Sequence, residues 1–425
     1  MTNTSFLHVA DVHLDSPLDQ LRRVDENTAN RLQLASRQSL QAVIATALEH
    51  KVAAVVIAGD LFDAPVKDVG AGLWVESQFR RLTRAGIPVV LIRGNHDALS
   101  NARRVIQWTD GIHELSAETP ETIVLENDSL ALHGQSFASR METNDLAALY
   151  PAPVQGCFNV GILHTSLSGS LQHDTYAPTT ITTLENLGYD YWALGHIHLR
   201  SPSSLSDRCY IGYSGNTQGR HIRESGAKGC QLVHVRDGRL DRIEFVPTDS
   251  LRWFELVIDL SEVEYLSEIE DLVEEAAVKQ VAGIDDRSLA VRIQLTGATK
   301  LHAELTRPGT SNRLADNFAN RLSAHFPIWI ERVKLATRPF TTFDSDDLIL
   351  PLQYMESVTD ELQNNDNARK EIMADLAVLL KKAGAELTGY DWPLAMPDRQ
   401  DPELLRIVQQ AEDLLVSRLA KECNS

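Results

Sequence analysis

Leu91-Ile92-Arg93-Gly94-Asn95-His96-Asp97 joins an apolar run to a tight polar loop. The run over residues 87–92 is short, rich in β-branched residues and ended by Gly94, which predicts a buried strand. An amide, an imidazole and a carboxylate follow directly, and in open α/β sheets ligands bind beyond the carboxyl ends of the strands. Gly, Asn and Asp also favour turns for backbone reasons alone. Whether this loop is a site or a plain turn therefore depends on whether the arrangement recurs.

Four other predicted strands end in the same way. The strands over 5–10, 52–58, 158–163 and 191–194 are followed by these polar residues: Asp11 and His13; Asp60; His164; His196 and His198. Two residues that are two apart on an extended segment point to the same side, so each such pair could bind one cation. A lone Asp-x-His is more often a turn or a hydrogen-bonded histidine. Five strand ends of this kind in one domain together indicate a metal site.

The pattern between these motifs predicts an α/β domain. Helices are expected over residues 30–50 and 68–85, between apolar strands. Such nearly continuous apolar strands, alternating with helices, are typical of a mainly parallel sheet covered by helices. Residues 122–125 and 129–133 are expected to form a meander, and residues 209–213, 229–235 and 243–246 to form antiparallel strands.

Composition points to a globular protein outside the secretory pathway. The chain has 425 residues, 43% apolar and 23% charged, enough for about three domains. It has no apolar run long enough to span a bilayer, and its first residues lack a secretory signal, so we expect a cytoplasmic protein with no membrane contact. The four cysteines are far apart and are expected to be free thiols.

Charge is unevenly distributed along the chain. The net charge of −19 argues against a globally basic nucleic-acid-binding protein. Residues 200–242 nevertheless hold eight Lys or Arg against four Asp or Glu, whereas residues 251–425 hold 19 against 31. The basic stretch is either a phosphate-binding rim near the motifs or a solvated surface of uneven composition.

The sequence after residue 250 predicts two further parts of the protein, a small domain and a helical segment. Residues 251–340 alternate strands (254–260, 289–295, 328–335) with helices (261–280, 311–324), and Ser261 is a plausible N-cap. This small α+β domain has lysine- and arginine-bearing loops that suit either a substrate-side cap or an ordinary surface. Residues 341–425 predict a linker and two helices, over 360–382 and 402–421. The apolar stripe of the last helix could pack on its own domain or dock a partner helix.

The donor types at the strand ends favour particular ions. Carboxylate, amide and imidazole ligands without thiolates suit Mn²⁺, Fe²⁺ or Zn²⁺ rather than a structural zinc knot. Seven candidate ligands exceed the needs of one ion, and two ions that share a carboxylate would use them fully.

The same five motifs resemble those of the calcineurin-like metallophosphoesterase superfamily, over roughly the first 250 residues. The wider layout is similar to SbcD-type DNA-repair exonucleases, and residues 214–221, Ser-Gly-Asn-Thr-Gln-Gly-Arg-His, resemble the YhaO branch. The resemblance implies a β-sandwich flanked by helices and two divalent metal ions, most readily Mn²⁺. It assigns Asp11, His13 and His198 to one ion, Asn95, His164 and His196 to the other, and Asp60 to both. It also implies that His96 contacts the phosphate and that Asp97 orients His96.

One position departs from the pattern of the nucleases. Asp63 stands where some nucleases of this family have a histidine, which leaves the details of end processing open. The protein-phosphatase branch has Asp-Arg-Gly after its bridging aspartate, whereas this chain has Leu61-Phe62-Asp63, so that branch is not favoured.

We therefore expect three parts: a nuclease domain over 1–250, an α+β capping or DNA-contact domain over 251–340, and a helical partner-docking segment over 341–425. The expected activity is two-metal hydrolysis of DNA, alongside an SMC-like coiled-coil ATPase and with homodimerisation possible. A small-molecule phosphodiesterase and a non-catalytic scaffold for the ATPase are the alternatives.

Overall fold

The computed structural model describes residues 3–16, 26–63, 69–99, 106–125, 127, 129–167, 176–200, 209–281, 284, 287–325 and 327–340. The chain divides into two compact units, of which the first comprises residues 1–256, 277–292 and 319–332. The second comprises residues 257–276, 293–318 and 333–425. The linker and helix pair expected over 341–425 lie outside the described residues, and the domain boundaries expected at 250 and 340 stay predictions.

A six-stranded sheet forms the centre of the first unit. Its order is β11-β10-β1-β2-β3-β4, and the strands are β1 Asn3–Val9, β2 Ala54–Ala58, β3 Val89–Ile92, β4 Ile112–Glu114, β10 Gly229–Arg236 and β11 Arg239–Pro247. Strands β1 to β4 are parallel, with α1 (Glu26–His50) and α2 (Val69–Arg84) as crossovers, whereas β10 and β11 are antiparallel. The mainly parallel sheet expected from the β-α-β-α-β pattern is confirmed.

A second sheet of five strands has the order β5-β6-β7-β8-β9. Its strands are β5 Glu121–Leu125, β6 Leu130–Gly134, β7 Phe158–His164, β8 Tyr191–Gly195 and β9 Tyr210–Tyr213. β5 and β6 form the expected antiparallel pair, but β9 pairs with β8 in parallel, so the antiparallel pairing expected for residues 209–213 is wrong. A four-residue apolar strand carries no signal of its direction, because its side chains alternate in the same way in both pairings.

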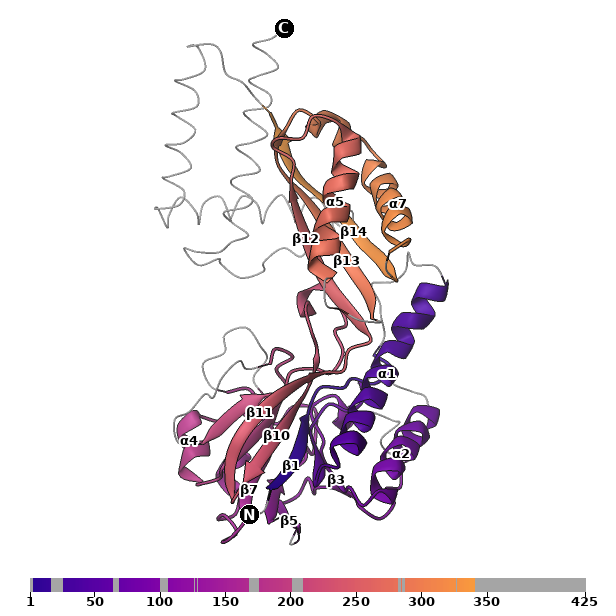
Figure 1. The fold of residues 1–425 in the computed structure, drawn as a ribbon. Coiled ribbons are helices and arrows are strands. Elements are labelled where there is room, and N and C mark those ends of the chain that lie inside the picture. Colours follow the sequence, from indigo (N-terminus) through magenta and orange to yellow (C-terminus); the bar gives the residue numbers. More distant parts are fainter. Residues whose placement is uncertain are drawn as a thin grey trace, which may run out of the picture. The chain divides into compact units, whose positions relative to one another are not determined.

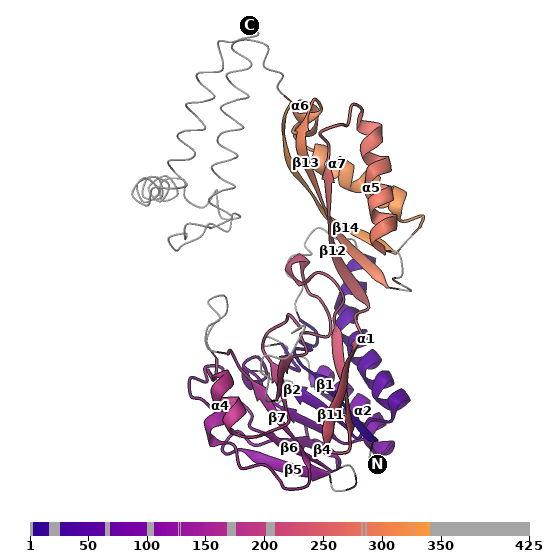
Figure 2. The same cartoon turned by 60° about the vertical axis from the view of Figure 1, so that its left-hand side comes forward.

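The two sheets pack face to face, and helices cover the outer face of the six-stranded sheet. Phe6, Val56 and Val90 of the six-stranded sheet share a buried cluster with Leu132 and Val160 of the other. The opposite faces of β1, β2 and β3 pack on α1 and α2, which lie along one side of this sheet in Figures 1 and 2. Burial on both faces explains why β2 and β3 are continuously apolar. The predicted β-sandwich flanked by helices is confirmed.

A three-stranded sheet, β12-β13-β14, follows in the chain. Its strands are β12 Leu251–Asp259, β13 Ser288–Thr299 and β14 Ile328–Pro339, with helices α5 Leu266–Val281, α6 His302–Leu305 and α7 Thr310–Leu322. The N-cap expected at Ser261 is wrong, because α5 begins at Leu266 and Ser261 donates to Asp259 instead. The backbone N–H groups of Glu264 and Tyr265 donate to the Glu268 carboxylate, which closes the start of the helix.

Two expectations from composition can be compared with the described part of the chain. No helix there is long and apolar enough to cross a lipid bilayer. Cys157, Cys209 and Cys230 form no disulfide within the described part of the chain, as expected, and Cys423 lies outside the described residues.

Candidate metal centre

Loops at the carboxyl ends of five strands form the site. Parallel pairing continues past the strand ends, because the N–H of Asp11 donates to Gly59 O at 3.1 Å and the N–H of His13 donates to Asp60 O at 3.0 Å. In the second sheet, the N–H of Thr165 donates to Gly195 O at 3.1 Å. These bonds keep the motifs side by side just where the regular strands end.

Four of the predicted site residues have left-handed backbone conformations. The φ angles are +50° for Asp11, +45° for His13, +51° for Asp60 and +101° for His196. Positive φ is uncommon for residues other than glycine and costs on the order of 1–3 kcal/mol at each position. The surrounding fold therefore holds these four side chains in place against a local conformational cost.

Asp11, His13 and His198 form one candidate ligand group, with one ligand atom of each lying within 4.8 Å of the others. The Nε2 atoms of His13 and His198 are 3.0 Å apart. His198 Nδ1 donates to Glu224 Oε1 at 2.7 Å, so its Nε2 presents a lone pair to the site. The structure brings together the three side chains that the resemblance assigns to one ion.

A second group contains Asp11, Asp60 and His164. His164 Nδ1 donates to Ala58 O at 3.0 Å, and its Nε2 lies 2.9 Å from Asn95 Oδ1 and 3.4 Å from Asp60 Oδ2. Burial alone would raise the pKa of Asp60, but the neighbouring His164 lowers it to about 2. Burial would likewise lower the pKa of His164, and Asp60 raises it to about 9. Asp60 and His164 thus form a buried ion pair.

Asp60 also belongs to a third group, with His13 and His96, so it lies between the two sides of the centre. His196 belongs to none of the three groups formed by the described residues. Its ring packs edge-on against His164 and Tyr176, with centroids at 5.3 and 5.2 Å, and its backbone N–H donates to the Asp11 carboxylate. His196 therefore borders the centre, beside the ring of a candidate ligand.

The side-chain partner of His96 is Asp63. His96 Nδ1 donates to Asp63 Oδ1 at 2.6 Å, and Ser16 donates to the other carboxylate oxygen, also at 2.6 Å. Burial alone would lower the pKa of His96, but the hydrogen bond to Asp63 and the carboxylate charges raise it. The expectation that Asp97 orients His96 needs correction, because the carboxylate that reaches the His96 ring belongs to Asp63.

Asp97 ties two loops together through the backbone. Its carboxylate accepts from the N–H groups of Leu61 at 3.2 Å, Phe62 at 2.8 Å and Gly94 at 3.0 Å. Burial, and then the charge of Asp60, raise the pKa of Asp97 to about 7. Its role in the fold is to hold the loop that carries Asp60 against the loop that carries His96.

Two glycines give the side chains the space to converge. A Cβ atom on Gly94 would lie 2.3 Å from Asp60 Oδ1, and one on Gly195 would lie 1.9 Å from Ala58 O. Both distances are shorter than any van der Waals contact. The glycines in Gly-Asn-His and Gly-His-x-His are therefore needed for close approach around the candidate ligands.

The donor set fits divalent cations. The buried Nδ1 of His13 has no hydrogen-bond partner among the described residues, and its Nε2 faces the Nε2 lone pair of His198. On the other side, His164 Nε2 faces oxygens of Asn95 and Asp60. The facing nitrogen lone pairs of His13 and His198 repel one another unless a proton or a cation lies between them, and imidazole, carboxylate and amide groups are the ligands of Mn²⁺, Fe²⁺ and Zn²⁺.

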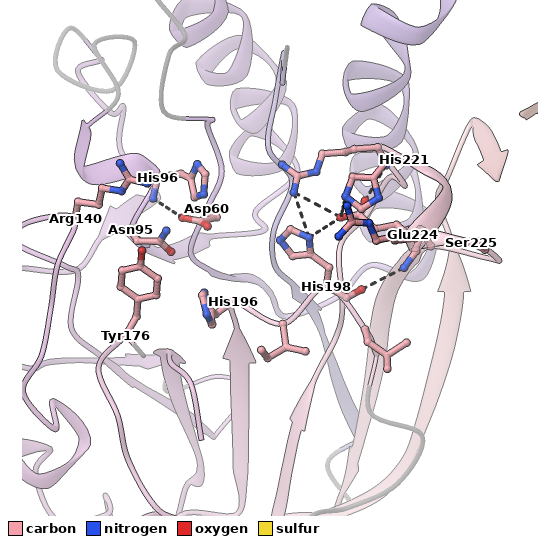
Figure 3. Close-up of a pocket in the computed structure, with 15 residues that line it drawn as sticks. Asp60, Asn95, His96, Arg140, Tyr176, His196, His198, His221, Glu224 and Ser225 are labelled. Atoms are coloured by element: carbon pink, nitrogen blue, oxygen red, sulfur yellow. Dashed lines mark hydrogen bonds and ion pairs between the residues drawn. The ribbon is translucent and has the colours of Figure 1, made fainter. Parts of the chain in front are cut away.

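The candidate centre opens into a cavity of about 580 Å³. Figure 3 shows Asp60, Asn95 and His196 between Arg140 on one side and His198, His221 and Glu224 on the other. The cavity lining includes four basic side chains outside the candidate ligands: Arg140, Arg220, Arg223 and Lys228. An anionic ligand would find an attractive potential there.

Sequence reasoning missed Glu224 and Arg220 as parts of the site. Both lie within the basic stretch 200–242, but local composition cannot single out one buried carboxylate or one arginine. The only available signal was the 214–221 motif, which includes Arg220 and ends three residues before Glu224.

A two-layer sandwich with carboxylate, amide and imidazole groups at its strand ends defines the class of metallophosphoesterases. Residues 4–200 match the calcineurin-like phosphoesterase family, and residues 253–338 match the middle domain of metallophosphoesterase YhaO. The chain belongs to the calcineurin-like metallophosphoesterases, in the YhaO family, and membership implies a hydrolase with two divalent metal ions.

We compare the chain with one protein of similar sequence and with one solved structure. An uncharacterized metallophosphoesterase, YhaO of Bacillus subtilis (strain 168), is 36% identical over 282 residues, which cover 66% of this chain and 69% of the relative. The crystal structure of a dimetal phosphatase from Danio rerio is 10% identical, with a TM-score of 0.32, and covers 55% of this chain and 92% of its own.

Proposed function

We propose that this metallophosphoesterase hydrolyses phosphodiester bonds of DNA, using two divalent cations, Mn²⁺ first among them. The observation that carries the proposal is the convergence of Asp11, His13 and His198, with Asp60 shared between two further groups that reach His164 and His96. Side chains almost two hundred positions apart in sequence thereby surround one small volume beside a basic cavity.

The proposed roles of the candidate ligands follow the two sides of the centre. Asp11, His13 and His198 would hold one ion, Asn95, His164 and His196 the other, and Asp60 would bind both. When bound, the ions supply Lewis acidity that polarises the phosphoryl oxygens and lowers the pKa of a water molecule. Glu224 and Ala58 O each accept from a ligand imidazole, which keeps the opposite ring nitrogen directed at the centre.

His96 is the proposed general acid. Its Nδ1 is held by Asp63 at 2.6 Å, and its side chain is 30% exposed at the cavity, so its Nε2 is free to face a bound phosphate. Because Asp63 favours the protonated imidazole, His96 can donate a proton to the departing oxygen of the ester. Asp97 contributes by fixing the loop on which His96 stands.

DNA as the substrate is favoured by the charge of the cavity. Four Lys or Arg side chains line it, although the whole chain carries a net charge of −19. A basic surface on an acidic protein concentrates a polyanion at one place. The likeness of the motifs to SbcD-type exonucleases supports the same substrate, and the α+β domain over 251–340 would add DNA contacts.

A cleavage assay tests this function. We would incubate labelled single- and double-stranded DNA, and separately a cyclic nucleotide, with the full chain and Mn²⁺. We expect DNA cleavage that His96→Ala reduces by about 10²-fold or more, as for loss of a general acid. His50→Ala, an exposed histidine at the end of α1, is the matched control. Cleavage of the cyclic nucleotide alone would reject DNA as the substrate, and equal rates for wild type and His96→Ala would remove His96 from the mechanism.

The proposed complex with an SMC-like coiled-coil ATPase involves the helix expected over 402–421. A chain ending at Ser345 should retain hydrolysis of bis(p-nitrophenyl) phosphate but should no longer bind the ATPase. Loss of hydrolysis in this shortened chain would instead assign the C-terminal residues to the catalytic unit.

A further inference from the structure

The loop between β9 and β10 places an arginine at the edge of the candidate metal centre. Arg220 Nη2 lies 3.2 Å from His198 Nδ1 and 3.5 Å from Glu224 Oε1, and its Nη1 lies 3.7 Å from Asp63 Oδ2. Arg220 thus stands between the partner of a candidate ligand, Glu224, and the partner of the proposed general acid, Asp63. Its side chain is 21% exposed and lines the cavity.

Both carboxylates beside Arg220 already accept shorter hydrogen bonds from other groups. Asp63 accepts from His96 and Ser16, both at 2.6 Å. Glu224 accepts from His198 at 2.7 Å, from Asn216 at 2.9 Å and from the backbone N–H of Arg220 at 2.8 Å. The contacts of the guanidinium with these carboxylates are 3.5 and 3.7 Å long, which is too long for strong hydrogen bonds.

Other arginines of the same unit show what a saturated pair looks like. Arg252 binds Asp249 through two N–H groups at 2.6 and 2.7 Å, and Arg292 binds Glu331 through two at 2.7 Å. Arg220 has no such two-point pair, and its Nε is buried with no hydrogen-bond partner among the described residues. His198 Nδ1 cannot serve as acceptor either, because it donates its proton to Glu224.

We propose that Arg220 binds the non-bridging oxygens of the substrate's phosphoryl group. A guanidinium has five N–H donors in a planar fork that matches two phosphate oxygens, and its two carboxylate neighbours hold it in place without occupying those donors. Since Arg220 adjoins both His198 and the Asp63–His96 pair, the phosphate that it binds is the one under attack. The inference rests on one part of the proposed function, namely that a phosphoester binds at this centre. It does not require that the phosphoester belongs to DNA.

Orthophosphate is the probe, since it presents the same oxygens. We would measure its inhibition constant against Mn²⁺-dependent hydrolysis of bis(p-nitrophenyl) phosphate, its direct binding by calorimetry, and the metal content of each variant. Arg220→Gln should weaken phosphate binding at least about tenfold at unchanged metal content, and Arg220→Lys should lie between it and wild type. Arg236→Gln removes the same charge from an exposed arginine that pairs with Asp241, and should match wild type.

Phosphate binding of Arg220→Gln within twofold of wild type would overturn the inference. If Arg220→Gln loses metal, the Arg220→Lys variant decides the question. The inference is overturned if Arg220→Lys keeps its metal and binds phosphate as tightly as wild type. It is also overturned if Arg220→Lys is folded but loses its metal. The two proposals can fail separately. If wild type cleaves no DNA but Arg220→Gln binds phosphate more weakly than wild type, the role of Arg220 is upheld and DNA is rejected as the substrate.

Discussion

His13 Nε2 lies 3.0 Å from His198 Nε2 at the centre of the candidate metal site. Because His198 donates through Nδ1 to Glu224, two nitrogen lone pairs face each other there unless a proton or a cation intervenes. We therefore expect Mn²⁺ at one hundred times its dissociation constant to stabilise the protein by about 2.7 kcal/mol, or roughly 3–5 °C in melting temperature.

His198→Gln should reduce this thermal shift, and His50→Gln should leave it intact, in scans run with Mn²⁺ and with a chelator. An equal shift in wild type and His198→Gln would mean that Mn²⁺ stabilises the fold somewhere else.

Asp60→Asn should lower the metal content of the purified protein from two ions towards none. Asp60 belongs to two of the three ligand groups, and an amide is a far weaker ligand than a carboxylate between two cations. Elemental analysis after dialysis measures the content, and Asp241→Asn, on β11, serves as the control. Two full equivalents in Asp60→Asn would refute the bridging role.

Gly94→Ala should lower the metal content of the protein, whereas Gly238→Ala should leave it unchanged. The new methyl group at position 94 would meet Asp60 Oδ1 at 2.3 Å, while one at position 238 would meet nothing within 4 Å. Gly238 has φ +72°, so its alanine variant should lose only about 1 kcal/mol of stability through backbone strain. Metal content and denaturant unfolding separate the two effects, and similar metal content in both variants would contradict the packing argument.

Asp63→Ala should slow hydrolysis of esters with poor leaving groups more than hydrolysis of p-nitrophenyl esters. Asp63 holds His96 through a 2.6 Å hydrogen bond, and a general acid matters most when the departing oxygen is strongly basic. We expect a loss of about tenfold or more in kcat for alkyl or nucleoside leaving groups and a smaller loss for p-nitrophenol. Equal losses for both classes would assign Asp63 to folding of the site alone.

His8 should make the protein less stable as the pH falls from about 6.5 to 4. Burial lowers the pKa of His8 from 6.5 to about 4, although its hydrogen bond to Leu194 O acts in the opposite direction. Between these two pH values the unfolded chain therefore binds a proton that the folded chain does not. The free energy of unfolding then decreases with falling pH, by up to about 3 kcal/mol from this group. Chemical denaturation across this range should give a flatter profile for His8→Gln, and parallel profiles would exclude His8 as the cause.

The strand-end positions of the site were predictable from the sequence, and their partners were not. Apolar runs ended by polar residues indicate strands in a parallel sheet, whose carboxyl ends share one edge, so Asp11, Asp60 and Asn95 could be grouped without coordinates. The contact of Asp63 with His96 and that of Glu224 with His198 depend on loop conformation, which follows no period in sequence. Asp97 shows this limit of prediction from sequence. It was expected to orient His96, its neighbour in sequence, but its carboxylate accepts hydrogen bonds from backbone N–H groups of two loops.

The candidate ligands come from both layers of the sandwich. Asp11, His13, Asp60 and Asn95 follow strands of the six-stranded sheet, whereas His164, His196 and His198 end or follow strands of the five-stranded sheet. Ions held between them would act as a cross-link across the seam of the two layers. Metal loss should then loosen the protein at this edge first, so that amide hydrogens at the ends of β2 and β7 exchange sooner while the opposite edge stays protected.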